Sequence, residues 1–141
     1  MGDTGLLISL AFDEKGLVDE EIYQKILFNK LAFNEGMIME NIVAQMLVAS
    51  GKKLYFYFNY DKENAENNME IDFLIAKNKI TSRHNVSPIE VKSSKNYTFS
   101  SLNKFKKKYK EYLYTSYVLH IDDLKVEDDV IFLPVYMTGL L

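Results

Sequence analysis

The 141-residue chain contains no cysteine and no tryptophan, and it has only two histidines. The absence of cysteine excludes disulfide bonds and thiolate metal ligands, and two histidines alone argue against a structural zinc site. The chain has no apolar run of about 18 residues, and its N-terminus lacks the basic and apolar regions of a secretory signal. We therefore expect a cytoplasmic protein that has no membrane partner.

Glycine is also scarce, and the six glycines cannot form the G-x-x-x-x-G-K-[ST] loop that cradles nucleotide phosphates. We expect no ATP site of that kind in this chain. The length and the 48% apolar content predict a single domain over residues 1–141. The net charge of -3 argues against a general nucleic-acid coat protein.

Hydrophobic periodicity predicts a mixed α/β domain, with a sheet of about five strands flanked by helices. Helical patterns follow Asp19 and Asn34, and the second should end at Gly51, a residue suited to the position after a helix. The apolar stripe of this second helix consists of Met39, Ile42, Val43, Met46 and Ala49. Strand patterns occupy residues 54–60, 70–76, 88–93, 116–121 and 130–137. A lysine-rich helix capped by Ser100 or Ser101 should run to about Tyr112 and form a βαβ crossover.

Two of these strands carry a pattern that suggests chemistry: Glu70-Ile71-Asp72-Phe73-Leu74 and Ile89-Glu90-Val91-Lys92-Ser93. Residues i and i+2 of a strand share a face, so Glu90 and Lys92 point the same way. Asp72 can join them if its strand pairs alongside. Two carboxylates are sufficient protein ligands for Mg²⁺ or Mn²⁺ when phosphate and water complete the shell. Lys92 could then orient a water or neutralise developing charge.

Each of these residues also has a simpler interpretation. Glu90 and Lys92 could form the solvent face of a strand, and Asp72 could take part in a surface ion pair. However, no structural partner for Asp72 is evident in the sequence. Charges among such apolar neighbours are costly unless a partner or a metal compensates them.

The combination of Asp72, Glu90-Val91-Lys92 and Glu40 on an upstream helix resembles the PD-(D/E)XK (restriction-endonuclease-like) nuclease superfamily. A wider set of motifs resembles the C-terminal domain of a family of uncharacterised prokaryotic AAA-type ATPases. These motifs are Asp3-Thr4-Gly5-Leu6-Leu7, Met39-Glu40-Asn41-Ile42-Val43-Ala44, Leu54-Tyr55-Phe56-Tyr57, Glu70-Ile71-Asp72-Phe73 and Pro88-Ile89-Glu90-Val91-Lys92-Ser93. The resemblance implies that the chain is the C-terminal part of a longer ATPase, and from the abrupt start we expect an excised domain or a truncated product.

The resemblance implies a metal-dependent DNA phosphodiesterase in which Asp72, Glu90 and Glu40 bind Mg²⁺ or Mn²⁺ and Lys92 assists the water. DNA would then contact the basic residues that follow this site, namely Lys95, Lys104, Lys107 and Lys108. For the lysine run alone, a solvated helix face is the simpler interpretation. The alternative function is a non-catalytic nucleic-acid- or protein-binding module that regulates or targets the ATPase.

Overall fold

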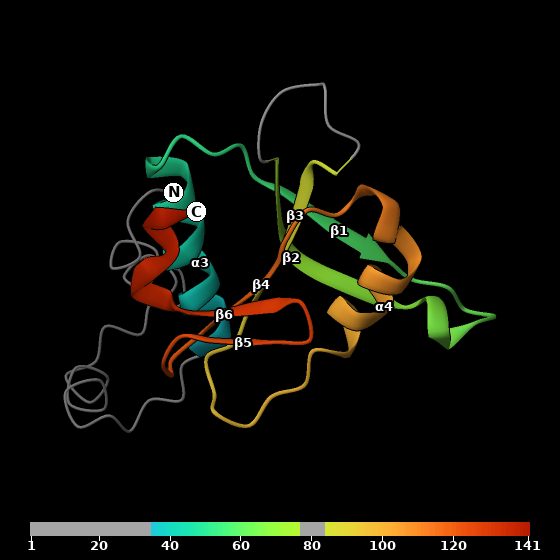
Figure 1. The fold of residues 1–141 in the computed structure, drawn as a ribbon. Helices are drawn as coiled ribbons and strands as arrows, with labels where there is room; N and C mark the ends of the chain where they lie inside the picture. Colours follow the sequence, from blue (N-terminus) through green and yellow to red (C-terminus); the bar gives the residue numbers. More distant parts are fainter. Residues whose placement is uncertain (1–34, 77–83) are drawn as a thin grey trace, which may run out of the picture.

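The structure is a computed structural model that describes residues 35–76 and 84–141 (Figure 1). Helix α3 (Glu35–Ala49) is followed by β1 (Tyr55–Asn59), the 3₁₀ turn η1 (Ala65–Asn67), β2 (Met69–Ala76) and β3 (Val86–Val91). Helix α4 (Ser100–Tyr109) and η2 (Lys110–Tyr112) precede β4 (Ser116–His120). The chain then forms β5 (Lys125–Glu127), β6 (Val130–Pro134) and η3 (Val135–Leu140). The predicted helix after Asp19, the cap at Asn34 and the expected turn at 77–79 lie outside the described residues.

The strands form one mixed sheet in the order β1-β2-β3-β4-β6-β5. The first three strands are antiparallel neighbours, whereas β3, β4 and β6 run parallel to one another. The predicted neighbourhood of the three strands that contain residues 54–60, 72 and 90 is therefore confirmed. The predicted βαβ crossover is also confirmed, because α4 connects the parallel strands β3 and β4.

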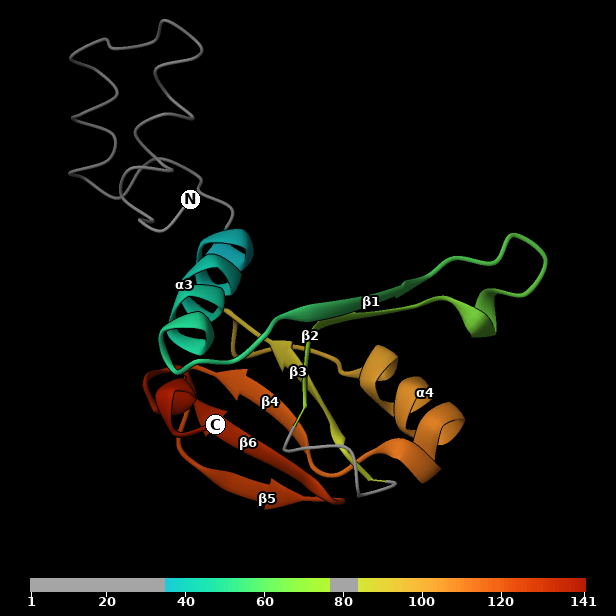
Figure 2. The same cartoon turned by 90° about the horizontal axis from the view of Figure 1, so that it is seen from above.

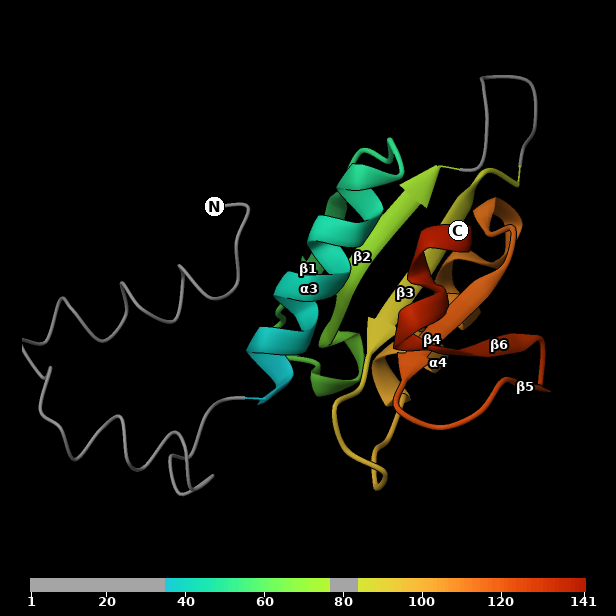
Figure 3. The same cartoon turned by 90° about the vertical axis from the view of Figure 1, so that its left-hand side faces the viewer.

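Helices cover the two faces of the sheet, with α3 and η3 on one face and α4 on the other (Figure 3). The core on the first face contains Val43 and Leu47 from α3, packed on Ile89 and Val91 of β3. The core on the second face contains Leu102 and Phe105 from α4, packed on strand residues such as Val118. The hairpin of β1 and β2 extends beyond these layers (Figure 2). Within the described residues, no helix is long and apolar enough to cross a bilayer.

The end of α3 agrees with the prediction from Gly51. This residue has a φ of 79°, and the N–H groups of Gly51 and Lys52 donate to the carbonyls of Val48 and Leu47 at 2.9 and 3.0 Å. This is the Schellman arrangement, in which a left-handed glycine lets the chain satisfy the last helical carbonyls. The predicted apolar stripe is wrong in part, because Val43 and Leu47 are the fully buried residues and Ala49 is exposed.

Other details differ from the predictions, and among them the last strand, predicted over 130–137, ends at Pro134, where η3 follows. Strand β3 begins at Val86 rather than at Pro88, and its ladder with β4 begins only at Ile89, after the proline that lacks an N–H. The residue before α4 is Phe99, without a side-chain cap, instead of a capping serine. The sheet has six strands rather than five, because the short, wholly exposed β5 pairs with β6.

Candidate functional site

The candidate site lies where β2 and β3 meet near the C-terminal end of β3. The antiparallel register ends with the pair Phe73 and Ile89, and Asp72 and Glu90 are the next residues along the two strands. Directly opposite residues of an antiparallel pair lie close enough for their side chains to interact. The two acidic residues that the sequence singled out therefore lie on neighbouring strands, and the charge of Asp72 acts on the carboxyl of Glu90.

A β-bulge in β2 determines where the Asp72 side chain goes. The flanking register pairs are Tyr55–Leu74 and Tyr57–Ile71. The single residue Phe56 on β1 therefore lies opposite two residues on β2, Asp72 and Phe73. Bulges interrupt the ladder and redirect side chains, and they are frequent beside functional sites. The sequence contains no glycine or proline here that could have signalled the bulge.

At the bulge, the side chain of Asp72 replaces the backbone as the partner of β3. Its Oδ2 accepts a hydrogen bond from the backbone N–H of Val91 at 2.7 Å. The expectation that Asp72 has no structural partner is therefore wrong. The partner is a backbone group distant in sequence, which residue types cannot reveal.

Glu90 is buried, with 2% of its surface exposed, and it has two different partners. Its Oε1 accepts a hydrogen bond from the N–H of Leu102 at 2.8 Å, in the first turn of α4. Glu90 thereby caps the helix that no local side chain caps, and a carboxylate at a helix N-terminus is favourable. Its Oε2 is buried and receives no hydrogen bond of standard geometry from the described residues, although the Nζ of Lys92 lies 3.0 Å away.

Lys92 follows the last residue of β3, and its side chain is 25% exposed. The backbone N–H of Lys92 donates to the carbonyl of Leu119 at 2.8 Å, which holds this residue against β4. Its ammonium group lies between the buried carboxylate of Glu90 and solvent. The predicted sharing of one face by Glu90 and Lys92 is confirmed by their ion pair.

The carboxyl groups of this site have raised pKa values. Burial raises the pKa of Asp72, and the hydrogen bond from Val91 and the charge of Lys92 oppose this shift. Burial also raises the pKa of Glu90, Lys92 lowers it, and the charge of Asp72 raises it further. Raised pKa values of this kind occur where acidic groups await a cation or a proton.

Glu40 on α3 faces the same region from the helix side. Burial raises the pKa of the Glu40 carboxyl, and the negative charges of Asp72 and Glu70 raise it further. These three residues line a cleft of about 390 Å³, together with Phe56 and other residues of β1 and β2. Glu70 was not among the predicted site residues, although its position two residues before Asp72 was a usable signal.

No three acidic or histidine side chains of residues 35–76 and 84–141 lie close enough to hold a metal ion together. A site for Mg²⁺ would therefore depend on two carboxylates, with water and phosphate as the remaining ligands. The buried Oε2 of Glu90, without a standard hydrogen bond, fits such a role. The donor set consists entirely of oxygens, as hard divalent cations require.

The four predicted DNA-binding lysines have different surroundings. Lys95 lies 3.7 Å from the carboxylate of Asp122. The ammonium of Lys104 donates to the carbonyls of Ala65 and Asn68, both at 3.2 Å, and so joins α4 to the loop around η1. Lys107 and Lys108 are exposed in the second half of α4, whose first turn is the part that contacts Glu90.

The fold and the site together define a mixed α/β domain with a cluster of acidic residues and one lysine beside a bulge. The model of the family called Domain of unknown function (DUF4143) matches residues 35–137, and the chain belongs to this family. No curated protein and no solved structure matched the chain.

Proposed function

We propose that this domain is a Mg²⁺- or Mn²⁺-dependent phosphodiesterase of the PD-(D/E)XK kind that acts on DNA. Asp72 and Glu90 would hold the cation, with Glu40 beside them, and Lys92 would act on the attacking water or on the phosphate. One observation carries the proposal. Two carboxyl groups with raised pKa values lie on neighbouring strands, the charge of Asp72 acts on Glu90, and the ammonium of Lys92 lies 3.0 Å from the carboxylate of Glu90.

When bound, the cation would polarise the phosphate and lower the pKa of a water molecule. The protein's own residues have separate tasks. The hydrogen bond from Val91 orients the carboxylate of Asp72, and the N-terminus of α4 orients that of Glu90. Lys92 opposes the rise in the pKa of Glu90 that burial causes, because a positive charge beside a carboxylate favours its charged form.

Isothermal titration of the metal-free chain with Mn²⁺ tests the cation site before any substrate is known. Wild type should bind Mn²⁺, whereas the Asp72→Asn and Glu90→Gln double variant should not. Asp123→Asn is the matched control, because Asp123 is an exposed carboxylate outside this cluster. Absence of binding at millimolar Mn²⁺, or unchanged binding in the double variant, would remove the basis of the proposal.

Cleavage is measured separately, with supercoiled plasmid DNA in Mg²⁺ or Mn²⁺. We expect wild type to nick the plasmid and Asp72→Asn to lose this activity while it keeps its fold. Asparagine retains an oxygen acceptor for Val91 and removes the charge that a cation needs. Binding of Mn²⁺ without nicking of any DNA would contradict the catalytic part of the proposal alone.

A second candidate function is a non-catalytic module that binds nucleic acid or protein and regulates an AAA-type ATPase domain of the same polypeptide. The observation that favours it is that Asp72, Glu90 and Lys92 already have internal partners. Asp72 accepts from Val91, Glu90 accepts from Leu102, and Lys92 pairs with Glu90. In this case Mn²⁺ would not bind, and substitution of Asp72 in the longer protein would change ATP hydrolysis without affecting DNA integrity.

A further inference from the structure

A second concavity lies at the other end of β4 from Lys92. It is bounded by the end of α4, the start of β4 and the turn between β5 and β6, and its volume is about 780 Å³. Ser116, the first residue of β4, lines it, whereas Lys92 contacts β4 at Leu119. Cavities of this size accommodate ligands as large as a nucleotide. We refer to this concavity as the basic cleft.

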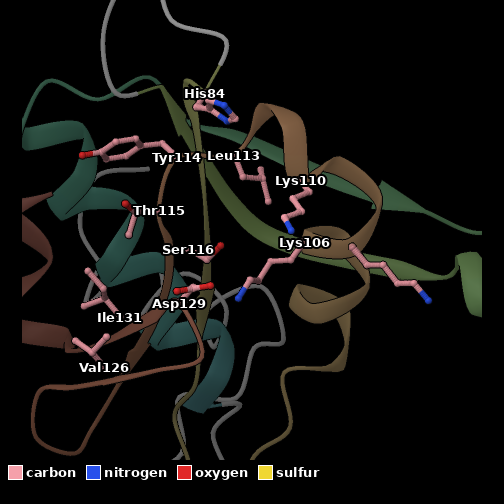
Figure 4. A pocket seen from close by; sticks show the side chains of 11 residues that line it. His84, Lys106, Lys110, Leu113, Tyr114, Thr115, Ser116, Val126, Asp129 and Ile131 are labelled. Atoms are coloured by element: carbon pink, nitrogen blue, oxygen red, sulfur yellow. The ribbon is translucent and has the colours of Figure 1, made fainter.

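Positive charge dominates the wall that α4 and η2 provide. Lys106, Lys107 and Lys110 line the basic cleft, and His84 lines it from the start of the β3 segment. Figure 4 shows the side chains of Lys106 and Lys110 extending from the helix into the same space. Asp129 is the one acidic residue among the described residues that line it, so lysines outnumber acids there by three to one.

The opposite wall combines hydroxyl groups with apolar side chains. Thr115 and Ser116 bring hydroxyls, and Val126 and Ile131 bring apolar surface, whereas the hydroxyl of Tyr114 points away from Lys106 and Lys110 (Figure 4). Ammonium and hydroxyl groups are the donors that phosphate oxygens accept from. An apolar wall beside them suits a planar or apolar body attached to that phosphate.

The turn at the mouth of the basic cleft fixes one of these lysines. Asp128 and Asp129 have φ values of 48° and 60°, a left-handed conformation that costs energy in residues other than glycine. The carbonyl of Asp128 accepts a hydrogen bond from the Nζ of Lys106 at 2.7 Å. An ammonium group has three donors, so this contact anchors Lys106 and leaves it able to donate to a ligand.

We propose that the basic cleft binds a phosphate ester of nucleotide size. Lys106 and Lys110 contact its phosphate, and the apolar wall contacts the planar base attached to that phosphate. Lys108 lies in α4 like Lys106 and serves as the comparison, because its surroundings are different. Its ammonium lies 5.4 Å from the ring centroid of Tyr109, and it does not line the basic cleft. The proposal does not depend on the cation site, because it involves different residues.

The test is an NMR titration of the ¹⁵N-labelled full chain with adenosine 5′-monophosphate at low salt. We expect shift changes at residues 113–116 and 126–131, weaker changes with inorganic phosphate, and none with adenosine. Lys110→Gln should weaken binding about ten-fold, since it removes a charge-assisted contact, whereas Lys108→Gln should change it less than about two-fold. The spectrum of each variant shows at the same time whether it is folded.

A 5′-phosphorylated trinucleotide distinguishes the two sources of this ligand chemistry. Tighter binding of the trinucleotide would assign the basic cleft to a nucleic-acid end, and tighter binding of the mononucleotide would assign it to a free nucleotide. Either result supports the phosphate-ester site. The proposal is overturned if no ligand shifts these residues at about 10 mM, well above the affinity of a specific site. Equal weakening by Lys108→Gln and Lys110→Gln would also overturn it, because that result indicates unspecific attraction to charge.

Discussion

Asp72 has both a structural contact and a raised pKa, and one substitution separates them. A carboxyl whose pKa is raised on folding gives stability that is fully present below its ordinary pKa of 3.8 and lost as pH rises through the raised value. Asparagine keeps the acceptor for Val91 and does not titrate. Between about pH 4 and about pH 8, the metal-free wild type should therefore lose more stability than Asp72→Asn.

Urea denaturation at the two pH values measures this difference, with Asp123→Asn as the control. With Mn²⁺ present, the difference in stability loss between wild type and Asp72→Asn should become smaller, because a bound cation stabilises the ionised carboxylate. Equal pH dependence of wild type and Asp72→Asn would show that folding does not raise the pKa of Asp72.

Glu90 supports the start of α4, and its loss should be costly. Glu90→Ala would leave the N–H of Leu102 without its acceptor and Lys92 without its ionic partner. We expect a decrease in the free energy of unfolding of about 3 kcal/mol. Glu90→Gln should cost less, because the amide oxygen can still accept from Leu102.

Thermal and urea unfolding of both variants check this prediction. Far-ultraviolet circular dichroism reports whether helix content falls in Glu90→Ala. Similar stability of the two variants would mean that the hydrogen bond to Leu102 contributes little and that charge alone matters.

At the scale of elements, the hairpin of β5 and β6 contains an avoidable strain. Its two turn residues, Asp128 and Asp129, both have positive φ values, as a type I′ turn requires. Glycine adopts this conformation without the steric cost, so Asp129→Gly should stabilise the protein by about 1 kcal/mol. The melting temperature should rise by about 2–5 °C.

Asp123→Gly is the matched control, because this exposed aspartate is not among the described residues with positive φ. It should destabilise slightly through the greater freedom of glycine in the unfolded chain. A decrease in stability for Asp129→Gly would show that its carboxylate contributes more than the backbone strain costs.

At the scale of the whole molecule, β1 presents an uncovered aromatic strip at the edge of the sheet. Phe56 and Phe58 of β1, and Tyr60 directly after it, alternate along the chain and are 80%, 63% and 64% exposed. Exposed apolar patches on edge strands favour association. Phe56→Ser with Phe58→Ser should therefore lower the binding of an apolar dye and any self-association, while stability changes by less than about 0.5 kcal/mol.

Dye fluorescence and sedimentation velocity measure these effects. Tyr57→Ser is the contrasting variant on the same strand, since the ring of Tyr57 packs against that of Phe105, with 5.0 Å between the ring centroids. It should destabilise the protein clearly. A comparable loss of stability in the Phe56 and Phe58 double variant would mean that those rings are covered in solution.

The sequence by itself determined most of the element order. Period-two and helical patterns predicted five of the six strands and both described helices, because burial of one face imposes these periods locally. Gly51 marked the end of α3, since few other residues adopt a positive φ. The acid-x-lysine pattern of Glu90 and Lys92 also follows from strand periodicity alone.

Tertiary structure alone decided how the site is assembled. Its contacts all join segments that are distant along the chain. They are the bulge at Asp72 and Phe73, the hydrogen bond from the Val91 N–H to Asp72 and the capping of α4 by Glu90. β5 forms because β6 supplies its hydrogen-bond partners, and its three exposed residues are too few to show a periodic pattern. Residue types and spacing encode local periods, but register and backbone partners depend on which segments pack together. The sequence could therefore name Asp72 and Glu90, and the fold had to decide what each of them contacts.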